Sequence, residues 1–429
     1  MRYLPINAEL FIQNRKKFAE KLKPGALAVF NSNDVMPTNG DGVMRFRQNS
    51  DLFYLCGIDQ EDTILLLFPE AKSASHREIL FIKETNERIK IWEGEKLSKD
   101  QARTISGIEK ICWLSEFESI FKMLAVEAEY IYLNTNEHQR ADTVVQTRDA
   151  RFIEWCKSKY PLHKYERSAP VLQELRAVKS EEEIKLMRKA IEITGKAFER
   201  VLKFIKPGVY EFEIEAEITH EFIRNRSEGH AYAPIIASGA RACILHYTEN
   251  NQMCSEADML LMDFGALYAN YAADLTRCVP VNGHFNKRQR EVYLAVLHIM
   301  DEAKKLLTPG RNLEQYHEQM VPVVQDALLS LGLLKKQDIE NEPKDKPAYK
   351  KYFMHGLSHF LGLDVHDVGS KYFTFKKGMV FTCEPGIYIP EENMGIRLEN
   401  NFLITDSIPE DLTAHIPLHP DDIEHKMNA

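Results

Sequence analysis

The chain has 429 residues, of which 44% are hydrophobic and 28% are charged, the composition of an ordinary globular protein. Its formal net charge of −9 at pH 7 provides no basic surface of the kind that binds nucleic acid. No apolar run approaches the ~18 residues of a membrane span, and the N-terminus lacks the apolar core of a signal peptide, so we expect neither a nucleic-acid partner nor a membrane.

The length and the cysteines set the expected organisation. At roughly 100–200 residues per domain, the chain is long enough for two domains. Seven cysteines, an odd number without a Cys-x-x-Cys pair, predict reduced thiols rather than a disulfide framework or a thiolate zinc cluster. We therefore expect a cytoplasmic protein.

The N-terminal part has the pattern of an α/β domain. Residues 8–22 form an amphipathic pattern that ends at Pro24-Gly25, which predicts a helix. Four short apolar runs, separated by polar or helix-like stretches, predict strands over 26–30, 64–68, 79–82 and 130–133. The polar and then aromatic stretch 45–55 is predicted to be a surface loop that enters a strand, with a substrate-facing edge as the alternative.

A domain boundary is expected near residues 169–175, and we place it so that the domains span 1–171 and 172–429. Ser180 and Glu183 then form a capping box, and the apolar residues that follow recur on one helix face as far as Pro207-Gly208. Residues 210–226 fit both a strand and a helix, and their Glu, Ala and Ile content favours a helix. The charged stretch 335–351, with two prolines, is predicted to be a solvated loop.

Two sequence patterns that each occur twice suggest that the C-terminal part is internally duplicated. Asn286 and Gln289 form a second capping box, and the predicted helix after it also ends at a Pro-Gly pair, Pro309-Gly310. Two apolar runs, 259–262 and 379–383, each lead directly to an acid and then a glycine. Either of these repeated patterns alone is weak evidence of an internal duplication.

A histidine-rich stretch, 354–367, is the first candidate for an active site. It contains His355, His359 and His366 among apolar residues, glycines and two aspartates. Imidazole is the commonest metal ligand and titrates near neutral pH. A single histidine in such a place is more often structural, but three beside two aspartates favour a site.

Four acids at the ends of predicted strands are the natural partners of His359. Asp263 and Asp274 flank one stretch rich in Gly, Ala and Tyr, and Glu384 and Glu399 flank another with Gly and Pro, so each pair fits a hairpin. Any one acid is more often a salt-bridge partner or a turn cap. Four converging carboxylates, however, would repel one another unless cations were bound. Four carboxylates and an imidazole suit Mn²⁺, Co²⁺, Fe²⁺ or Zn²⁺, and five ligands suit two ions ~3.5–4 Å apart.

Five motifs follow one another along the chain: Met262-Asp263-Phe264-Gly265, Asp274-Leu275-Thr276-Arg277, His355-Gly356-Leu357-Ser358-His359, Glu384-Pro385-Gly386 and Ile396-Arg397-Leu398-Glu399. In their order and approximate spacing the chain resembles the pita-bread metallopeptidases, and within that family the aminopeptidase P branch. The stretches 245–250 and 355–367 resemble that branch in particular, and 47–51 resembles its N-terminal domain. The resemblance covers nearly the whole chain.

The resemblance implies an α/β (α+β) fold, with a creatinase-like N-terminal domain followed by a pita-bread domain with internal duplication. It implies two divalent metal ions, Mn²⁺ foremost, and a homo-oligomer, either a dimer or a tetramer. The implied metal ligands are Asp263, Asp274, His359, Glu384 and Glu399, and the implied catalytic or substrate-contacting residues are Glu384, His246, His355, His366, Arg397 and Tyr232. Asn400 departs from the pattern, because these enzymes often have an acid there.

The implied activity is that of an Xaa-Pro aminopeptidase. Such an enzyme releases the N-terminal residue of peptides with proline second, by attack of a metal-bridging hydroxide on the carbonyl before the proline. Prolidase, which cleaves only Xaa-Pro dipeptides, remains an alternative because its motifs are nearly the same. A non-catalytic binding protein on the same scaffold is the third possibility, which the complete ligand set opposes.

Overall fold

The computed structural model describes residues 2–343 and 345–429, and the chain divides into two compact units. One unit spans Tyr3–Arg176 and the other Ala177–Ala429. This division lies close to the domain boundary expected after residue 171, which stays a prediction. In the described part of the chain, no helix combines the length and the apolar character needed to cross a membrane.

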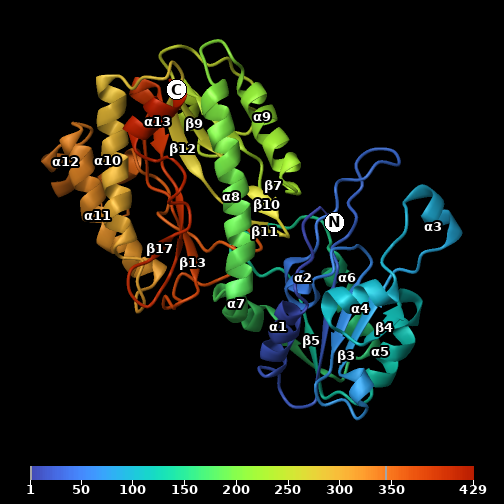
Figure 1. Ribbon diagram of the computed structural model, residues 1–429. Coiled ribbons are helices and arrows are strands. Elements are labelled where there is room, and N and C mark those ends of the chain that lie inside the picture. The colour runs from blue at the N-terminus through green and yellow to red at the C-terminus, as the bar shows by residue number, and fades with distance from the viewer. Residues whose placement is uncertain (1, 344) are drawn as a thin grey trace. The chain divides into compact units, whose positions relative to one another are not determined.

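The first unit is built on a six-stranded mixed sheet in the order β4-β3-β2-β1-β5-β6 (Figure 1). The strands are β1 (Ala26–Asn31), β2 (Ile64–Leu67), β3 (Glu78–Ile82), β4 (Lys110–Trp113), β5 (Tyr130–Leu133) and β6 (Lys164–Arg167). The helices are α1 (Glu9–Ala19), α2 (Ser50–Cys56), α3 (Glu87–Trp92), α4 (Lys99–Ser106), α5 (Phe117–Ala125), α6 (Arg148–Lys159) and α7 (Ala169–Ala177). The four predicted strands and the first predicted helix are confirmed.

Helices cover both faces of this sheet, which explains why its central strands are apolar without alternation. On one face, Phe30 of β1 meets Phe18 of α1 at 5.3 Å between ring centroids. On the other face, Val29 and Phe81 pack with Phe121 of α5 in one buried cluster. The first unit is therefore an α/β domain, as predicted.

The expected strand within residues 45–55 is wrong. Residues from Ser50 to Cys56 form helix α2, which begins where the Asn49 side chain accepts hydrogen bonds from the backbone N–H groups of Asp51 and Leu52. An asparagine cap thus outweighs the strand preference of the aromatic residues that follow it.

The second unit repeats one order of elements: two helices, a strand, a hairpin and a returning strand. Its helices are α8 (Glu181–Phe204), α9 (Glu211–Arg224), α10 (Lys287–Lys304), α11 (Leu313–Ser330), α12 (Lys336–Glu340) and α13 (Pro420–Met427). Its strands are β7 (Gly229–His230), β8 (Ile235–Ser238), β9 (Met259–Asp263), β10 (Ala266–Tyr268), β11 (Tyr271–Ala272), β12 (Thr276–Pro280), β13 (Val380–Cys383), β14 (Gly386–Ile389), β15 (Met394–Arg397), β16 (Asn400–Leu403) and β17 (Glu410–Asp411).

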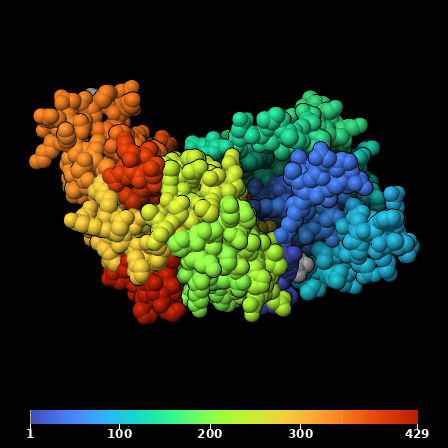
Figure 2. All heavy atoms as spheres, turned by 90° about the horizontal axis from the view of Figure 1, so that it is seen from above, coloured from blue at the N-terminus to red at the C-terminus, as the bar shows by residue number. Residues whose placement is uncertain are grey.

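The repeat is visible in how the strands pair. In the first half β9 pairs with β12, and β10 and β11 form the hairpin between them. In the second half β13 pairs with β16, and β14 and β15 form the hairpin. The helix pairs α8–α9 and α10–α11 each pack together (Figure 1), and Figure 2 shows atoms of α8 and α9, green to yellow-green, on the outer face of this unit.

Three helix predictions in this unit are confirmed, and the predicted loop is partly wrong. Both capping boxes form, at Ser180 for α8 and at Asn286 for α10. The ambiguous stretch 210–226 is helix α9. Residues 335–351 include α12 and a 3₁₀ turn at Ala348–Lys351, with the Tyr349 ring buried, while Lys344 lies outside the described residues.

Candidate metal centre and active site

In the first half of the second unit, Asp263 and Asp274 lie at the two ends of the β10–β11 hairpin. Asp263 ends β9, and the chain then turns back through Gly265 into the β10–β11 hairpin. A Cβ atom on Gly265 would lie 1.8 Å from the Ala273 carbonyl oxygen, so only glycine permits this close return. Asp274 follows the hairpin, just before Thr276 pairs with Asp263 in the β9–β12 ladder.

The second half delivers Glu384 and Glu399 in the same way, and hydrogen bonds join the halves. Glu384 follows β13, and Glu399 precedes β16. The backbone N–H of Glu399 donates to the Thr276 carbonyl at 3.1 Å. The Asn401 side-chain amide donates to the Asp274 carbonyl at 2.6 Å and accepts from the Asp274 N–H at 3.3 Å. These bonds hold Asp274, which precedes β12, beside Glu399, which precedes β16.

The histidine-rich stretch lies along β13. The His359 N–H donates to the Thr382 hydroxyl at 3.1 Å, and the Thr382 N–H donates to the His359 carbonyl at 3.0 Å. The Glu384 N–H donates to the Leu357 carbonyl at 2.9 Å. His359 is therefore held next to the strand end that carries Glu384.

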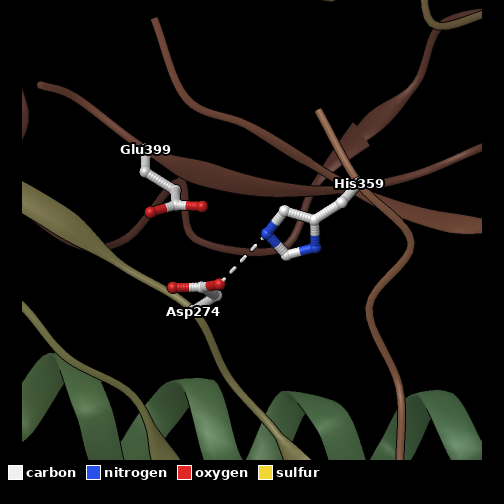
Figure 3. A group of neighbouring side chains, drawn as sticks. All are labelled: Asp274, His359 and Glu399. Carbon is white, nitrogen blue, oxygen red and sulfur yellow. Dashed lines mark ion pairs between the residues drawn. The ribbon is translucent and has the colours of Figure 1, made fainter. Parts of the chain in front are cut away.

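These segments bring the five predicted ligand residues together. Ligand atoms of Asp274, His359 and Glu399 all lie within 4.8 Å of one another, and the three side chains point toward a common centre (Figure 3). His359 Nε2 lies 3.4 Å from Asp274 Oδ2 and 3.7 Å from Glu384 Oε1. The Tyr232 hydroxyl joins Asp263 to the group, since it lies 2.5 Å from an oxygen of Asp263 and 2.5 Å from one of Asp274.

Two atoms in this group have the chemistry of metal ligands. His359 Nδ1 lies 2.9 Å from the Phe360 carbonyl oxygen and donates to it, so Nε2 is the ring nitrogen that faces Asp274 and Glu384. Burial lowers the pKa of His359, but the Asp274 and Glu384 carboxylates outweigh this effect and raise it. Glu399 Oε1 is buried and has no hydrogen-bond partner among the described residues. Lone pairs facing carboxylates repel unless a proton or a cation lies between them. The donor set therefore fits divalent cations.

The pKa values of the acids show the same repulsion. Burial raises the pKa of Glu399 well above its usual range, and the carboxylates of Asp274 and Glu384 raise it further. Burial also raises the pKa of Asp263, and it raises that of Glu384 to about 7 although His359 and Arg397 oppose the shift. These carboxylates are costly to ionise together without added positive charge.

Arg397 and Tyr388 form a chain of hydrogen bonds from Asp263 to His355. Arg397 Nη2 donates to Asp263 Oδ2 at 2.6 Å, and Nη1 donates to the Tyr388 hydroxyl at 2.9 Å. His355 Nδ1 donates to the Gly356 carbonyl at 2.7 Å, so Nε2 accepts from the Tyr388 hydroxyl at 2.8 Å. Burial, then the Arg397 guanidinium, lowers the pKa of His355 to about 4, so this ring is neutral at pH 7.

The other two predicted histidines lie at the edge of the group, and both are exposed. The His366 ring stands edge-on to the His359 ring, with 4.5 Å between centroids and an interplanar angle of 89°. His246 is near enough to His355 to be among the charges that lower the pKa of that residue. Burial, and then the Asp263 and Asp274 carboxylates, raise the pKa of Tyr232 far above its usual value.

Sequence reasoning missed three residues that support the acids. Thr276 donates its hydroxyl hydrogen to Glu399 Oε2 at 2.7 Å, Asn401 clamps the Asp274 backbone, and Tyr388 links Arg397 to His355. Thr276 and Asn401 contact residues of the other half of this unit, and Tyr388 contacts His355, which is 33 residues away in sequence, so no local motif could reveal these contacts. Asn400 is buried and donates to Asp411 Oδ2 at 2.7 Å.

Comparison with known proteins assigns this chain and its fold to a class. Residues 185–406 match the model of metallopeptidase family M24, and residues 11–132 match that of the aminopeptidase P N-terminal domain. The chain is 34% identical to an Xaa-Pro aminopeptidase of Escherichia coli over 99% of its own length and 98% of that protein. It is 32% identical to human Xaa-Pro aminopeptidase 3, covering 92% of this chain and 79% of that one.

Solved structures agree with the sequence comparisons. A zinc-substituted aminopeptidase P of E. coli in complex with product has a TM-score of 0.87 and 33% identity, and the match covers 99% of each chain. Aminopeptidase PepP of Pseudomonas aeruginosa has a TM-score of 0.89 and 30% identity, covering 99% of this chain and 98% of that one. The chain belongs to metallopeptidase family M24. Within that family it stands with the aminopeptidase P proteins, and its second unit has their pita-bread fold.

Proposed function

We propose that this protein is an Xaa-Pro aminopeptidase, a metal-dependent exopeptidase that removes the first residue from peptides with proline in second position. The observation that carries the proposal is the clustering of ligand atoms of Asp274, His359 and Glu399 within 4.8 Å of one another, with Glu384 Oε1 3.7 Å from His359 Nε2. The names of the similar proteins support the substrate class.

The proposed metal ligands are Asp263, Asp274, His359, Glu384 and Glu399, which would hold two divalent cations. Mn²⁺ is the foremost candidate and Co²⁺, Fe²⁺ and Zn²⁺ are alternatives, because an oxygen-rich set with one imidazole suits all of them. Such cations would polarise the scissile carbonyl and lower the pKa of a water molecule. The repulsion among the carboxylates, described above, supports this role.

The chain's own residues would orient the substrate and move its protons. Glu384 would accept the proton of the attacking water, a role that suits a carboxyl whose pKa is near neutrality. His366 and His246, which are exposed at the edge of the site, would contact the substrate. His355 would line the proline pocket as a neutral ring held by Tyr388. Arg397 would fix Asp263, and Tyr232 would orient both aspartates.

A bond before proline suits this kind of site. The proline nitrogen has no hydrogen, and the ring restricts the residue before it, so peptidases that bind the amide hydrogen at this bond are at a disadvantage. A site that acts on the carbonyl by electrostatics needs no such hydrogen.

Prolidase activity is the competing function, and peptide length separates the two. The proposal predicts that Ala-Pro-Ala and longer Ala-Pro peptides lose their N-terminal alanine with Mn²⁺ present, and that Ala-Pro alone is a poorer substrate. Hydrolysis of Ala-Pro alone would identify a prolidase. If no peptide is cleaved although the purified protein holds metal, the protein is a binding protein on the same scaffold.

We further propose the domains as 1–171 and 172–429, and a homo-oligomer, dimer or tetramer, as the working form. Light scattering of the purified protein tests the oligomer. We place the protein in the cytoplasm because all seven cysteines are free thiols and six of them are buried.

A further inference from the structure

Lys179 and Asp367 form an ion pair inside the second unit. Lys179 Nζ lies 3.0 Å from Asp367 Oδ2, and each side chain is 1% exposed. A buried pair of this kind is costly to desolvate, and it gains little stability over an apolar pair of the same size. Its presence next to the histidine-rich stretch therefore suggests a geometric role.

Lys179 stands on a fixed part of the fold. It precedes Ser180, the capping residue of the long helix α8, and its own N–H donates to the Gly378 carbonyl at 2.8 Å. Glu183, in the first turn of α8, accepts from the Tyr271 hydroxyl of β11 at 3.1 Å and is buried. The lysine is thus anchored between a helix start and the hairpin that precedes Asp274.

Asp367 stands on a segment without regular secondary structure. Residues 362–378 are all described, and none of them lies in a helix or strand. Backbone hydrogen bonds hold this segment at several points. Near the ion pair, the Asp367 N–H donates to the Phe360 carbonyl at 2.9 Å and the Ala272 N–H donates to the Gly362 carbonyl at 2.8 Å; at the far end, the Gly378 N–H donates to the Ile404 carbonyl at 3.0 Å. His366, whose ring stands edge-on to that of His359, directly precedes Asp367.

The backbone of Gly362 lies directly on the ion pair. A Cβ atom on Gly362 would lie 2.2 Å from Asp367 Oδ2 and 2.9 Å from Lys179 Cε. The glycine, the carboxylate and the lysine are therefore closely packed, and a larger side chain at position 362 would clash with the ion pair.

We infer that Lys179 is a positioning residue, which holds Asp367 so that the neighbouring His366 faces the substrate beside His359. The inference rests on the proposed function, because it assigns a task to His366 in that reaction. Lys179 touches neither substrate nor metal in this account. It acts through the backbone of a segment that lacks regular structure.

The first test replaces the lysine with a side chain of similar length and no charge, Lys179→Met. We expect kcat for Ala-Pro-Ala with Mn²⁺ to fall about tenfold to a hundredfold, since a misplaced catalytic contact has effects of that size. KM and the metal content of the purified variant should stay within about twofold of wild type, because a contact made in the transition state acts on kcat. Lys179→Arg, which keeps the charge, should recover part of kcat.

A double-mutant cycle separates positioning from general damage. If Lys179 acts through His366, then Lys179→Met should have almost no further effect on kcat in a His366→Ala background. Equal effects of Lys179→Met in both backgrounds would overturn the inference. Unchanged kcat in folded Lys179→Met would also overturn it.

Gly362→Ala serves if Lys179→Met does not fold, because it displaces Asp367 without leaving a buried charge unpaired. It should show the same loss of kcat and the same dependence on His366. Glu78→Gln is the matched control, since Glu78 pairs with the buried Arg15 at 3.0 Å in the first unit, and it should leave kcat unchanged. If wild type cleaves no Xaa-Pro peptide, the proposed function fails; if wild type cleaves and the cycle is additive, only this inference fails.

Discussion

At the residue scale, Glu384 is both a proposed metal ligand and the proposed proton acceptor. It lies 3.7 Å from His359 Nε2 among the proposed metal ligands, and burial raises its pKa to about 7. Glu384→Gln keeps the size of the side chain and removes both a negative ligand and a proton acceptor. We expect kcat to fall by at least ~10²–10⁴-fold, the usual effect of losing a general base, with an unchanged circular dichroism spectrum. Activity near that of wild type in metal-loaded Glu384→Gln would disprove the role.

Substitutions of His366 and His355 should affect different kinetic properties. His366→Ala should lower mainly kcat, because a contact to developing negative charge is strongest in the transition state. His355→Ala should lower the preference for proline over alanine in second position, since its ring is held rigidly by Tyr388 and Gly356. The measurement is kcat and KM of both variants on Ala-Pro-Ala and Ala-Ala-Ala. A change in KM alone for His366→Ala, or an unchanged proline preference for His355→Ala, would contradict these roles.

At the residue scale, the sequence predicts the acids of the site but not the residues that hydrogen-bond to them. Asp263 and Glu384 follow apolar strands directly, so a reader of the sequence can select them. Asn401 cannot be selected in this way, because its partner is the Asp274 backbone in the other half of the unit. Contacts between strands far apart in sequence require the fold.

At the element scale, the capping residues determine where helices begin, which the periodicity of apolar residues does not fix. Both predicted capping boxes form, and each begins a long helix. The aromatic residues of 45–55 favour a strand, but the Asn49 cap begins helix α2 at Ser50. A cap satisfies backbone N–H groups that have no partner within the helix, which is why one residue can outweigh several weak preferences.

The cap of α2 can be tested alone, because all three tryptophans of the chain, Trp92, Trp113 and Trp155, lie in the first unit. We expect Asn49→Ala to lower the free energy of unfolding of that unit by about 1 kcal/mol, the usual effect of losing a cap. Urea unfolding followed by tryptophan fluorescence measures it. Asn39→Ala, at an exposed loop residue, is the control. Equal midpoints for both variants would show that the cap does not hold α2.

At the scale of the whole molecule, the site should make the metal-free protein sensitive to pH. The Glu384 carboxyl has a folded pKa of about 7, above the usual value of 4.5. Between these values the unfolded chain ionises this group while the folded protein keeps its proton, so the free energy of unfolding falls as pH rises from about 4.5 to about 7. Divalent metal should reverse this loss, because it binds the ionised carboxylates.

Thermal unfolding followed by circular dichroism, with and without chelator, tests this dependence. The difference between wild type and Glu384→Gln isolates the contribution of one carboxyl, since the amide does not titrate. We expect metal-free wild type to lose stability relative to Glu384→Gln as pH rises through this window. A difference that is constant with pH would contradict the account.

The whole-molecule fold was predictable because its evidence is spread along the chain. The apolar runs, the Pro-Gly stops and the ordered motifs each constrain a different segment, and together they indicated two domains with a duplicated second one. The ion pair between Lys179 and Asp367 was not predictable, because its partners are far apart in sequence and Lys179 belongs to no motif.

The central claim is that the converging carboxylates bind metal ions that this protein uses to release the residue before proline. The most direct measurement is mass-spectrometric detection of free alanine from Ala-Pro-Ala, with protein stripped of metal and then titrated with Mn²⁺. The account predicts no release by the metal-free protein, release that rises until about two Mn²⁺ ions are bound, and little release from Ala-Ala-Ala. Release by the metal-free protein, or equal release from both peptides, would contradict it.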